Sequence, residues 1–297
     1  MRKIATLIAI AMVVAALMPA AVAQGNDQKM MSETGPPPIL HIGREEIKPG
    51  KQFAHEKNET AWTQALVRSK YEQGFLAAES VTGPTEVLWF YGFPTMAAFE
   101  ADYKAGSSAS SLASISMQYG PQEADLVAGS SDIIARFRGD LSYNPDINVG
   151  EYRYFNINTT RVRPGHNNDY IDFIKTVNEA RKSTNSEAHV AVYQVISGAP
   201  NGTFLIFTPR KSLAEMDASN EAMTQAMNAV QDKVNSLVEK SIISATTAIY
   251  AFNPRMSKPT EAIAKADPKF WKPKMTMAAA APSQPAAKAA APAKNKP

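Results

Sequence analysis

Apolar and polar residues alternate between residues 151 and 163, a stretch rich in Tyr, Phe, Ile and Thr, and this pattern predicts a strand. Pro164-Gly165 predicts a turn, and apolar residues at the spacing of a helix follow it. Next come predicted strands at residues 188–197 and 203–208, a helix that begins at Pro209, and a last strand at residues 245–252. The predicted order is therefore strand, helix, strand, strand, helix, strand.

The first part of the chain predicts the same order of elements. Its predicted strands cover residues 39–47, 75–82, 87–93 and 132–138, and its first predicted helix covers residues 51–70. A second helical stretch after Pro94 is interrupted at residues 105–111 and at Gly120-Pro121.

The two parts align with each other at a constant distance along the chain. A shift of 115 residues places Pro49-Gly50 on Pro164-Gly165, Gly83 on Gly198 and Pro94 on Pro209, without a gap. These matches fall at turns and element starts, where Gly and Pro fix the backbone geometry. A constant offset of this kind favours an internal duplication.

The element order predicts the fold class. A βαββαβ unit is the ferredoxin-like motif, whose helices cover one face of a four-stranded sheet. The other, apolar face must be covered as well. We therefore expect an α+β fold in which two ferredoxin-like repeats pack sheet to sheet as a single-chain α/β barrel. Repeat 1 is expected at residues 39–138, a linker at 139–150 and repeat 2 at 151–254.

A strand that runs into Ile47-Lys48-Pro49-Gly50-Lys51 or Val162-Arg163-Pro164-Gly165-His166, followed by a helix, resembles the dimeric α/β-barrel superfamily. The nearest families are the NIPSNAP, EthD-like and antibiotic-biosynthesis-monooxygenase-like families. The resemblance covers residues 39–254 and implies the fold. Members of the superfamily include cofactor-free oxygenases, haem enzymes, decarboxylating enzymes and proteins without known activity, so the resemblance leaves the function open.

Both ends of the chain have the composition of segments outside the folded body. Residues 1–23 combine a basic start, an apolar run and Ala21-Val22-Ala23, which predicts a signal peptide and export to the periplasm or the medium. No later segment is apolar enough to predict a transmembrane helix. Residues 24–38 predict a flexible segment, and residues 255–297 predict a mostly disordered basic tail rich in Ala, Pro and Lys. Phe270 and Trp271 are expected to dock back on the body.

Charge and composition limit the partners and cofactors. The tail holds nine Lys or Arg and two Asp or Glu, while the whole chain carries a net charge of only +3, so the body is acidic. An acidic body argues against a nucleic-acid partner, whereas the tail suits an anionic envelope surface or serves only for solubility. The chain has no cysteine and four scattered histidines, so we expect no metal site and no cofactor, with haem as the alternative.

The lumen between the two sheets is the expected ligand site. Strand alternation divides the first strands into two faces. We assign Leu40, Ile42, Phe155 and Ile157 to the helix side, and the set with His41, Tyr154 and Asn156 to the lumen. His41 and Asn156 are then the candidate catalytic pair, able to move a proton and orient an oxyanion. The alternative is that both are ordinary polar groups of the barrel wall.

The other candidates are strand residues that could contact a flat apolar ligand. They are Trp89, Tyr91, Tyr154, Arg136, Glu79, Gln194 and Tyr250. Core packing of the aromatic residues and an ion pair of Arg136 are the alternatives. We expect a protein that binds a small apolar or aromatic molecule without catalysis. The alternatives are a cofactor-independent oxygenase or isomerase, and an envelope-associated scaffold that acts through its tail.

Overall fold

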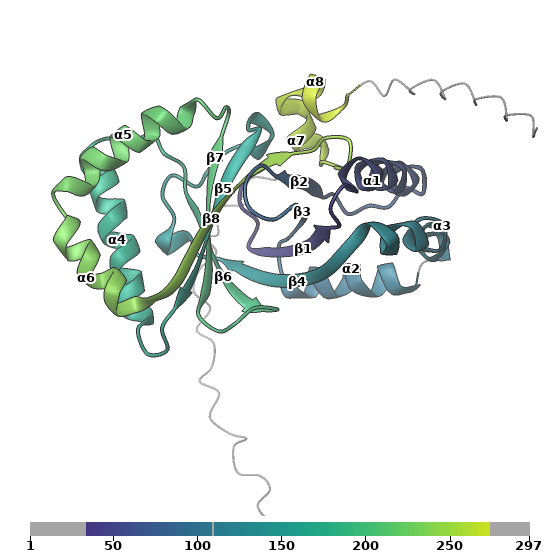
Figure 1. Cartoon of the computed structure of the whole chain (residues 1–297). Coiled ribbons are helices and arrows are strands. Elements are labelled where there is room, and N and C mark those ends of the chain that lie inside the picture. Colours follow the sequence, from purple (N-terminus) through teal and green to yellow (C-terminus); the bar gives the residue numbers. More distant parts are fainter. Residues whose placement is uncertain (1–33, 109, 274–297) are drawn as a thin grey trace, which may run out of the picture. The chain divides into compact units, whose positions relative to one another are not determined.

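The computed structural model describes residues 34–273 except residue 109 (Figure 1). The predicted signal peptide, most of the predicted flexible segment (residues 24–33) and residues 274–297 of the predicted tail lie outside the described residues. Within the described part, no helix combines the length and the hydropathy needed to cross a membrane.

The first half of the body follows the predicted order of elements, with the second helix divided in two. The elements are β1 (Ile39–Ile47), α1 (Gln52–Arg68), β2 (Leu76–Ser80), β3 (Glu86–Phe93), α2 (Met96–Ser108), α3 (Ser110–Leu126) and β4 (Val127–Phe137). The expected break at residues 105–111 is confirmed by the boundary between α2 and α3. The expected break at Gly120-Pro121 is wrong, because α3 continues through Pro121.

The second half repeats this order after two short 3-10 turns, Gly139–Leu141 and Val149–Glu151. Its elements are β5 (Tyr154–Val162), α4 (Asn167–Ser183), β6 (Ala191–Ser197), β7 (Thr203–Arg210), α5 (Glu215–Asn228), α6 (Gln231–Ser241) and β8 (Ile242–Phe252). Gly50 and Gly165 have φ values of +76° and +85°, so the two Pro-Gly turns use the left-handed conformation that glycine allows.

The eight strands form one closed barrel in the order β1-β3-β2-β8-β5-β7-β6-β4. All neighbouring strands are antiparallel, and the two halves meet where β2 pairs with β8 and β4 pairs with β6. Helices α1, α2 and α3 lie beside the strands of the first half, and α4, α5 and α6 lie beside those of the second (Figure 1). The expected closed α+β barrel is confirmed.

The lumen is filled by the side chains that we assigned to the helix side. Leu40, Ile42, Phe155 and Ile157 belong to one buried core that contains residues from both halves. The Phe155 ring lies 5.5 Å from that of Phe90, across the barrel. The assignment of faces is therefore wrong, because the more apolar face of each strand points into the lumen. Smaller cores on the helix sides contain Trp89 and Phe75 in the first half and Tyr170 and Phe204 in the second.

The strand registers show one departure from a constant offset. Gly43 pairs with Asp132 in β4 and Asn158 with Thr247 in β8, which keeps the offset of 115 residues. Gly43 also pairs with Trp89 in β3, and Asn158 pairs with Ile206 in β7. Equivalent residues of β3 and β7 are therefore 117 residues apart, not 115. The turn between β6 and β7 is therefore two residues longer, and the gapless alignment of Pro94 with Pro209 is wrong. Pro209 lies inside β7 and does not open a helix.

The chain continues as a folded segment beyond the expected end of the body. Helix α7 (Glu261–Ala266) and helix α8 (Pro268–Trp271) follow β8, so the expected disorder from residue 255 is wrong for this part. Trp271 is only 2% exposed, and its Nε1 donates a hydrogen bond of 2.8 Å to the Gly150 carbonyl. Its ring lies 5.5 Å from Phe252, at the edge of the barrel core. The expected docking of Trp271 on the body is confirmed.

Candidate functional site

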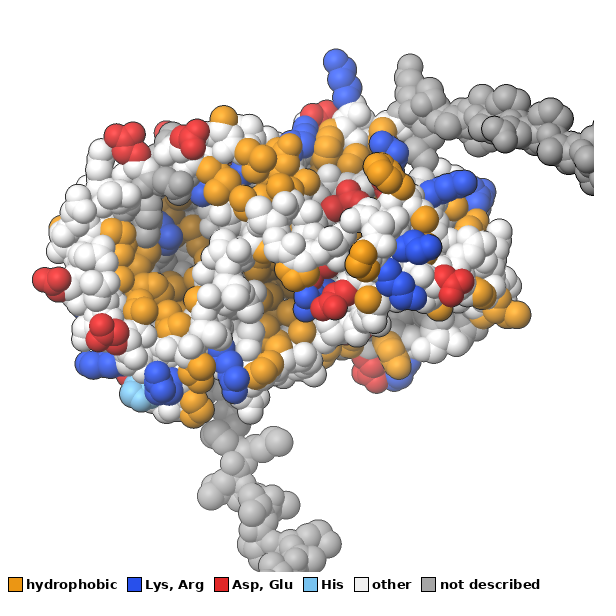
Figure 2. All heavy atoms as spheres, in the orientation of Figure 1, with side chains coloured by type: hydrophobic (Ala, Val, Ile, Leu, Met, Phe, Trp, Pro, Cys, Tyr) orange, Lys and Arg blue, Asp and Glu red, His pale blue; other side chains and the backbone are white. Residues whose placement is uncertain are grey.

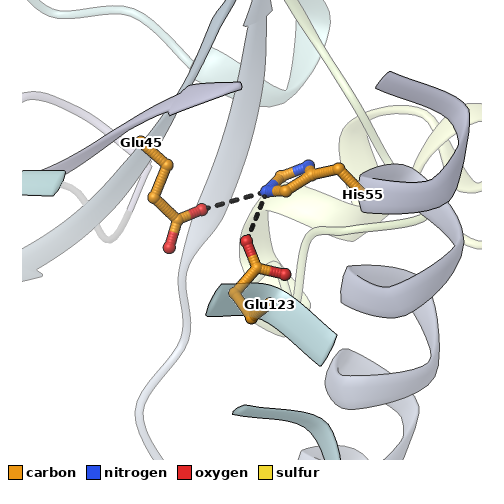
Figure 3. A group of neighbouring side chains, drawn as sticks. All are labelled: Glu45, His55 and Glu123. Atoms are coloured by element: carbon orange, nitrogen blue, oxygen red, sulfur yellow. Dashed lines mark hydrogen bonds and ion pairs between the residues drawn. The ribbon is translucent and has the colours of Figure 1, made fainter. Parts of the chain in front are cut away.

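A histidine and two carboxylates converge between β1 and the helices of the first half (Figure 3). His55 comes from the first turn of α1 and is 1% exposed. Its Nε2 lies 3.2 Å from an oxygen of Glu45 in β1 and 3.0 Å from an oxygen of Glu123 in α3. The side chains of Glu45 and Glu123 are 24% and 13% exposed, so the cluster is largely removed from water. The consecutive elements β1 and α1, together with the more distant α3, thus point polar atoms at one place.

Neighbouring polar groups hold the two carboxylates in position. The indole Nε1 of Trp89 donates a hydrogen bond of 2.7 Å to Glu45. The amide of Asn58, also on α1, donates a hydrogen bond of 2.8 Å to Glu123. The buried Glu59 accepts a longer hydrogen bond of 3.3 Å from the same amide. Such outer contacts fix the orientation of groups that bind an ion.

The cluster contains more acidic groups than its single histidine can neutralise. Burial alone would lower the pKa of His55, but hydrogen bonds and charge from Glu123 and Glu45 outweigh it and raise the pKa to about 9. Burial raises the pKa of Glu59 to about 9, and the neighbouring Glu123 adds to this effect. Burial acts in the same direction on Glu123, but hydrogen bonds from His55 and Glu59 and the charge of His55 lower its pKa. At neutral pH and without an ion, His55 and Glu59 therefore each hold a proton.

The fold does not require polar groups at this place. The buried face of α1 carries His55, Asn58, Glu59 and Thr63 at helical spacing. In α4, 115 residues later, Tyr170 and Ile174 occupy the positions of His55 and Glu59, and both are buried in an apolar core. Thr160 of β5 corresponds to Glu45. Replacement of a buried ionic group by well-packed apolar residues is often neutral or stabilising, and the second half shows that apolar residues suffice for packing at this place.

The geometry of the cluster fits a divalent metal ion. Two ligands at about 2.1 Å from one ion lie about 3.0–3.4 Å apart in octahedral or tetrahedral coordination. The distances from His55 Nε2 to the two carboxylate oxygens fall in or next to this range. All three donor atoms lie within 4.8 Å of one another. The Glu123 oxygen nearest to His55 is buried and forms an ion pair with its Nε2 at 3.0 Å. One imidazole and two carboxylates suit Zn²⁺, Mn²⁺ or Fe²⁺.

The predicted catalytic pair does not form a shared site. His41 lies on the helix side of β1, where its Nε2 is 2.8 Å from Asp132 and its ring contacts Tyr91 and Phe99. Asn156 lies on the helix side of β5 in the other half, because the alternate residues Phe155 and Ile157 fill the lumen. Both side chains point away from the lumen, so their predicted placement is wrong.

Most of the other predicted ligand-binding residues also lie on the helix side. Trp89 and Tyr91 pack around the core that contains Phe75. Burial raises the pKa of Glu79, which accepts a hydrogen bond of 3.0 Å from Asn253. Gln194 accepts one of 2.9 Å from Arg138. Tyr154 and Arg136 alternate with core residues of the lumen, so they point outward.

Tyr250 is the one member of the predicted set whose side chain belongs to the lumen core. Its hydroxyl donates a hydrogen bond to the buried carboxylate of Glu86, which also accepts one from Arg44. Burial and the Glu86 carboxylate raise the pKa of Tyr250. This network closes one end of a lumen otherwise packed with apolar and aromatic side chains, so the side chains themselves fill the space where we expected a ligand.

Sequence reasoning missed the cluster of Glu45, His55 and Glu123. His55 lies in a polar helical stretch, residues 55–59, and the four scattered histidines have no metal-binding spacing among themselves. One signal was present: the helical stripe of His55, Asn58, Glu59 and Thr63 is polar where a helix that covers a sheet is expected to be apolar. A polar stripe on a buried helix face indicates a site.

Comparisons with known proteins show the fold alone. No protein-family model matches the chain, and no curated protein matches its sequence. Among solved structures, an anthrone oxidase-like protein is 11% identical, with a TM-score of 0.50 over 72% of this chain and 91% of its own. A proposed monooxygenase from Fusobacterium nucleatum is 14% identical, with a TM-score of 0.47 over 73% and 93% of the two chains. A mutant chlorite dismutase from Candidatus Nitrospira defluvii is 8% identical, with a TM-score of 0.46 over 77% and 96%.

The likeness to the anthrone oxidase-like protein shows the class of fold alone: the chain has an α+β barrel fold of the ferredoxin-like kind. Membership of the dimeric α/β-barrel superfamily stays a prediction. The nearer NIPSNAP and EthD-like families stay predictions.

Proposed function

We propose that this protein binds one divalent transition-metal ion through Glu45, His55 and Glu123. The observation that carries the proposal is the convergence of both carboxylates on the same Nε2 of a buried histidine, at 3.0 and 3.2 Å. Two carboxylates also balance the charge of a divalent ion, whereas the single imidazolium leaves an excess of negative charge in a buried place.

Three protein ligands leave the ion an open position. Structural zinc sites have four protein ligands, whereas catalytic sites have three and keep the fourth position for water or substrate. Of the three ligands, Glu45 is the most exposed, so the open position faces the solvent on its side. We therefore propose a site of the open type, in which a bound ion would activate water or polarise a small oxygen ligand.

Metal binding to the mature, untagged protein tests the proposal. We expect one equivalent of Zn²⁺ or Mn²⁺ in calorimetric titration and, with Co²⁺, visible absorption bands of a protein-bound ion. His55→Gln and Glu123→Gln are expected to weaken binding about a hundredfold or more, since loss of an outer contact alone costs about 10- to 100-fold. His166→Gln is the matched control, because His166 pairs with Asp169 on the surface of the second half.

Two results would overturn the metal proposal. The first is a wild-type protein that takes up none of the three ions at micromolar concentration. The second is a His55→Gln variant that binds them as tightly as the wild type and the His166→Gln control.

Three earlier interpretations stand as further proposals. The first is that the body consists of two ferredoxin-like repeats packed sheet to sheet, supported by the equal offset of β1 with β4 and of β5 with β8. The second is export, supported by the composition of residues 1–23. The third is contact of the basic tail with an anionic envelope surface, supported by its charge.

A further inference from the structure

The second half contains a cavity of about 300 Å³ on the helix side of its strands. It lies between α4, the α5–α6 region and the strands β6 and β7, and its apolar wall includes Phe173, Val177, Val190, Val192, Ile206 and Val238. Hydrophobic side chains gather in a hollow of this part of the surface, with a basic group among them (Figure 2). This volume lies at the lower end of the range for small-molecule sites, about 300–1,000 Å³.

In the first half, aromatic side chains stand at three positions that correspond to the cavity wall. By the strand registers and the offset of the helices, Val177 corresponds to Trp62, Val190 to Phe75 and Ile206 to Trp89. Phe75 and Trp89 are buried there and pack edge to face, with ring centroids 6.0 Å apart. Smaller side chains thus stand in the second half at the positions of three aromatic residues of the first half. Small-molecule sites are concave and mostly apolar, so this hollow is a candidate binding site.

One wall of the cavity carries a cation. Arg181, near the end of α4, lines the cavity and donates a hydrogen bond of 2.7 Å to Asn178. Burial and the charge of Arg210 lower its pKa to about 10, and among the described residues no carboxylate acts on it. Arg210 at the end of β7 has a buried Nε without a hydrogen-bond partner among the described residues, although Glu215 lies near it. Leu66 stands at the position of Arg181 in the first half.

We propose that this cavity binds a carboxylate with an apolar chain of medium length. The chain occupies the space left by Val177, Val190 and Ile206, and the carboxylate pairs with the guanidinium of Arg181. A planar guanidinium binds a carboxylate through two parallel hydrogen bonds, and it is more weakly hydrated than an ammonium, so a partly buried Arg suits this ligand. The site lies in the other half of the barrel from the metal cluster and does not depend on it.

Titration calorimetry with octanoate and with 1-octanol, on the mature protein, tests this proposal. We expect octanoate to bind, and Arg181→Gln to weaken it about 10- to 100-fold, the effect of losing charge-assisted hydrogen bonds. The dissociation constant of octanol is expected to change by no more than about twofold in Arg181→Gln, because octanol does not use the charged contact that this variant loses. Lys182→Gln, which removes the exposed neighbouring cation, is the matched control and is expected to bind octanoate like the wild type.

A second variant tests the cavity itself. Val190→Phe introduces the side chain that the first half carries at this place and is expected to weaken octanoate and octanol alike. Circular dichroism checks that each variant is folded, and Val177→Leu serves as a milder filling variant if Val190→Phe is not. The proposal is overturned if the wild type binds neither compound at millimolar concentration, if Lys182→Gln loses as much affinity as Arg181→Gln, or if the folded filling variants bind both compounds unchanged.

Discussion

Replacement of Phe155 by alanine is expected to lower the free energy of unfolding by about 4 kcal/mol, the usual loss for a large aromatic residue in a core. Phe155 is 4% exposed and lies in the middle of the lumen. Its ring centroid is 4.8 Å from Phe252 and 5.6 Å from Tyr250, while Phe90 contacts it from the other half. The alanine variant would therefore lose contacts that hold the two half-sheets together.

The neighbouring residue provides the control for this prediction. Asn156 points to the other face of the same strand, and its buried Oδ1 has no hydrogen-bond partner in the part of the chain that the structure describes. Asn156→Ala is therefore expected to change the free energy of unfolding by no more than about 1 kcal/mol. Urea unfolding followed by tryptophan fluorescence measures both variants. A larger loss for Asn156→Ala than for Phe155→Ala would reverse our assignment of the two faces.

The second large effect is a loss of stability of the metal-free protein at alkaline pH. The pKa of His55 rises from an ordinary value of 6.5 to about 9 on folding, so the folded state binds this proton more tightly than the unfolded state. The resulting stabilisation is complete below about pH 6.5 and disappears as the pH rises through 9. It amounts to about 3 kcal/mol by the usual conversion of a pKa shift. The pKa of Glu59 is also raised on folding, from 4.5 to about 9, so its contribution to stability likewise decreases as the pH rises above about 4.5.

Melting temperatures between pH 6 and pH 10, in the presence of a chelator, measure this dependence. His55→Gln is expected to be less stable than the wild type at pH 6 and to show a shallower decline toward pH 9. His166→Gln is expected to follow the wild type, because its histidine is on the surface. Equal slopes for the wild type and His55→Gln would show that His55 does not carry the linked proton.

The element order was predictable from sequence because each signal is local. Pro-Gly before Lys51 and His166, and apolar spacing in α4, define turns and helices without reference to the rest of the chain. The face of each strand was not predictable in the same way. Strands of this barrel are covered by helices on one side and by the lumen core on the other, so neither face is a plain solvent face. Alternation distinguishes a core face from a solvent face, but it does not distinguish two core faces.

The candidate site could not be predicted from the sequence for a different reason. Glu45, His55 and Glu123 lie on a strand and two separate helices, so no spacing in the sequence relates them. Only the packing of α1 and α3 beside β1 brings their side chains together (Figure 3). The cavity beside Arg181 could not be predicted either, because its small lining side chains lie on elements that meet only in the folded chain.

One chain supplies all eight strands of the barrel. In an assembly of identical subunits every substitution is present in each copy, and a new charge or cavity is introduced twice. Here a substitution at His55 has no counterpart at Tyr170, and one at Arg181 has none at Leu66. Selection can therefore act on each side of this barrel separately, and the well-packed side keeps the fold stable while the other changes its chemistry. Covalent connection thus allows asymmetric specialisation that a symmetric assembly does not permit.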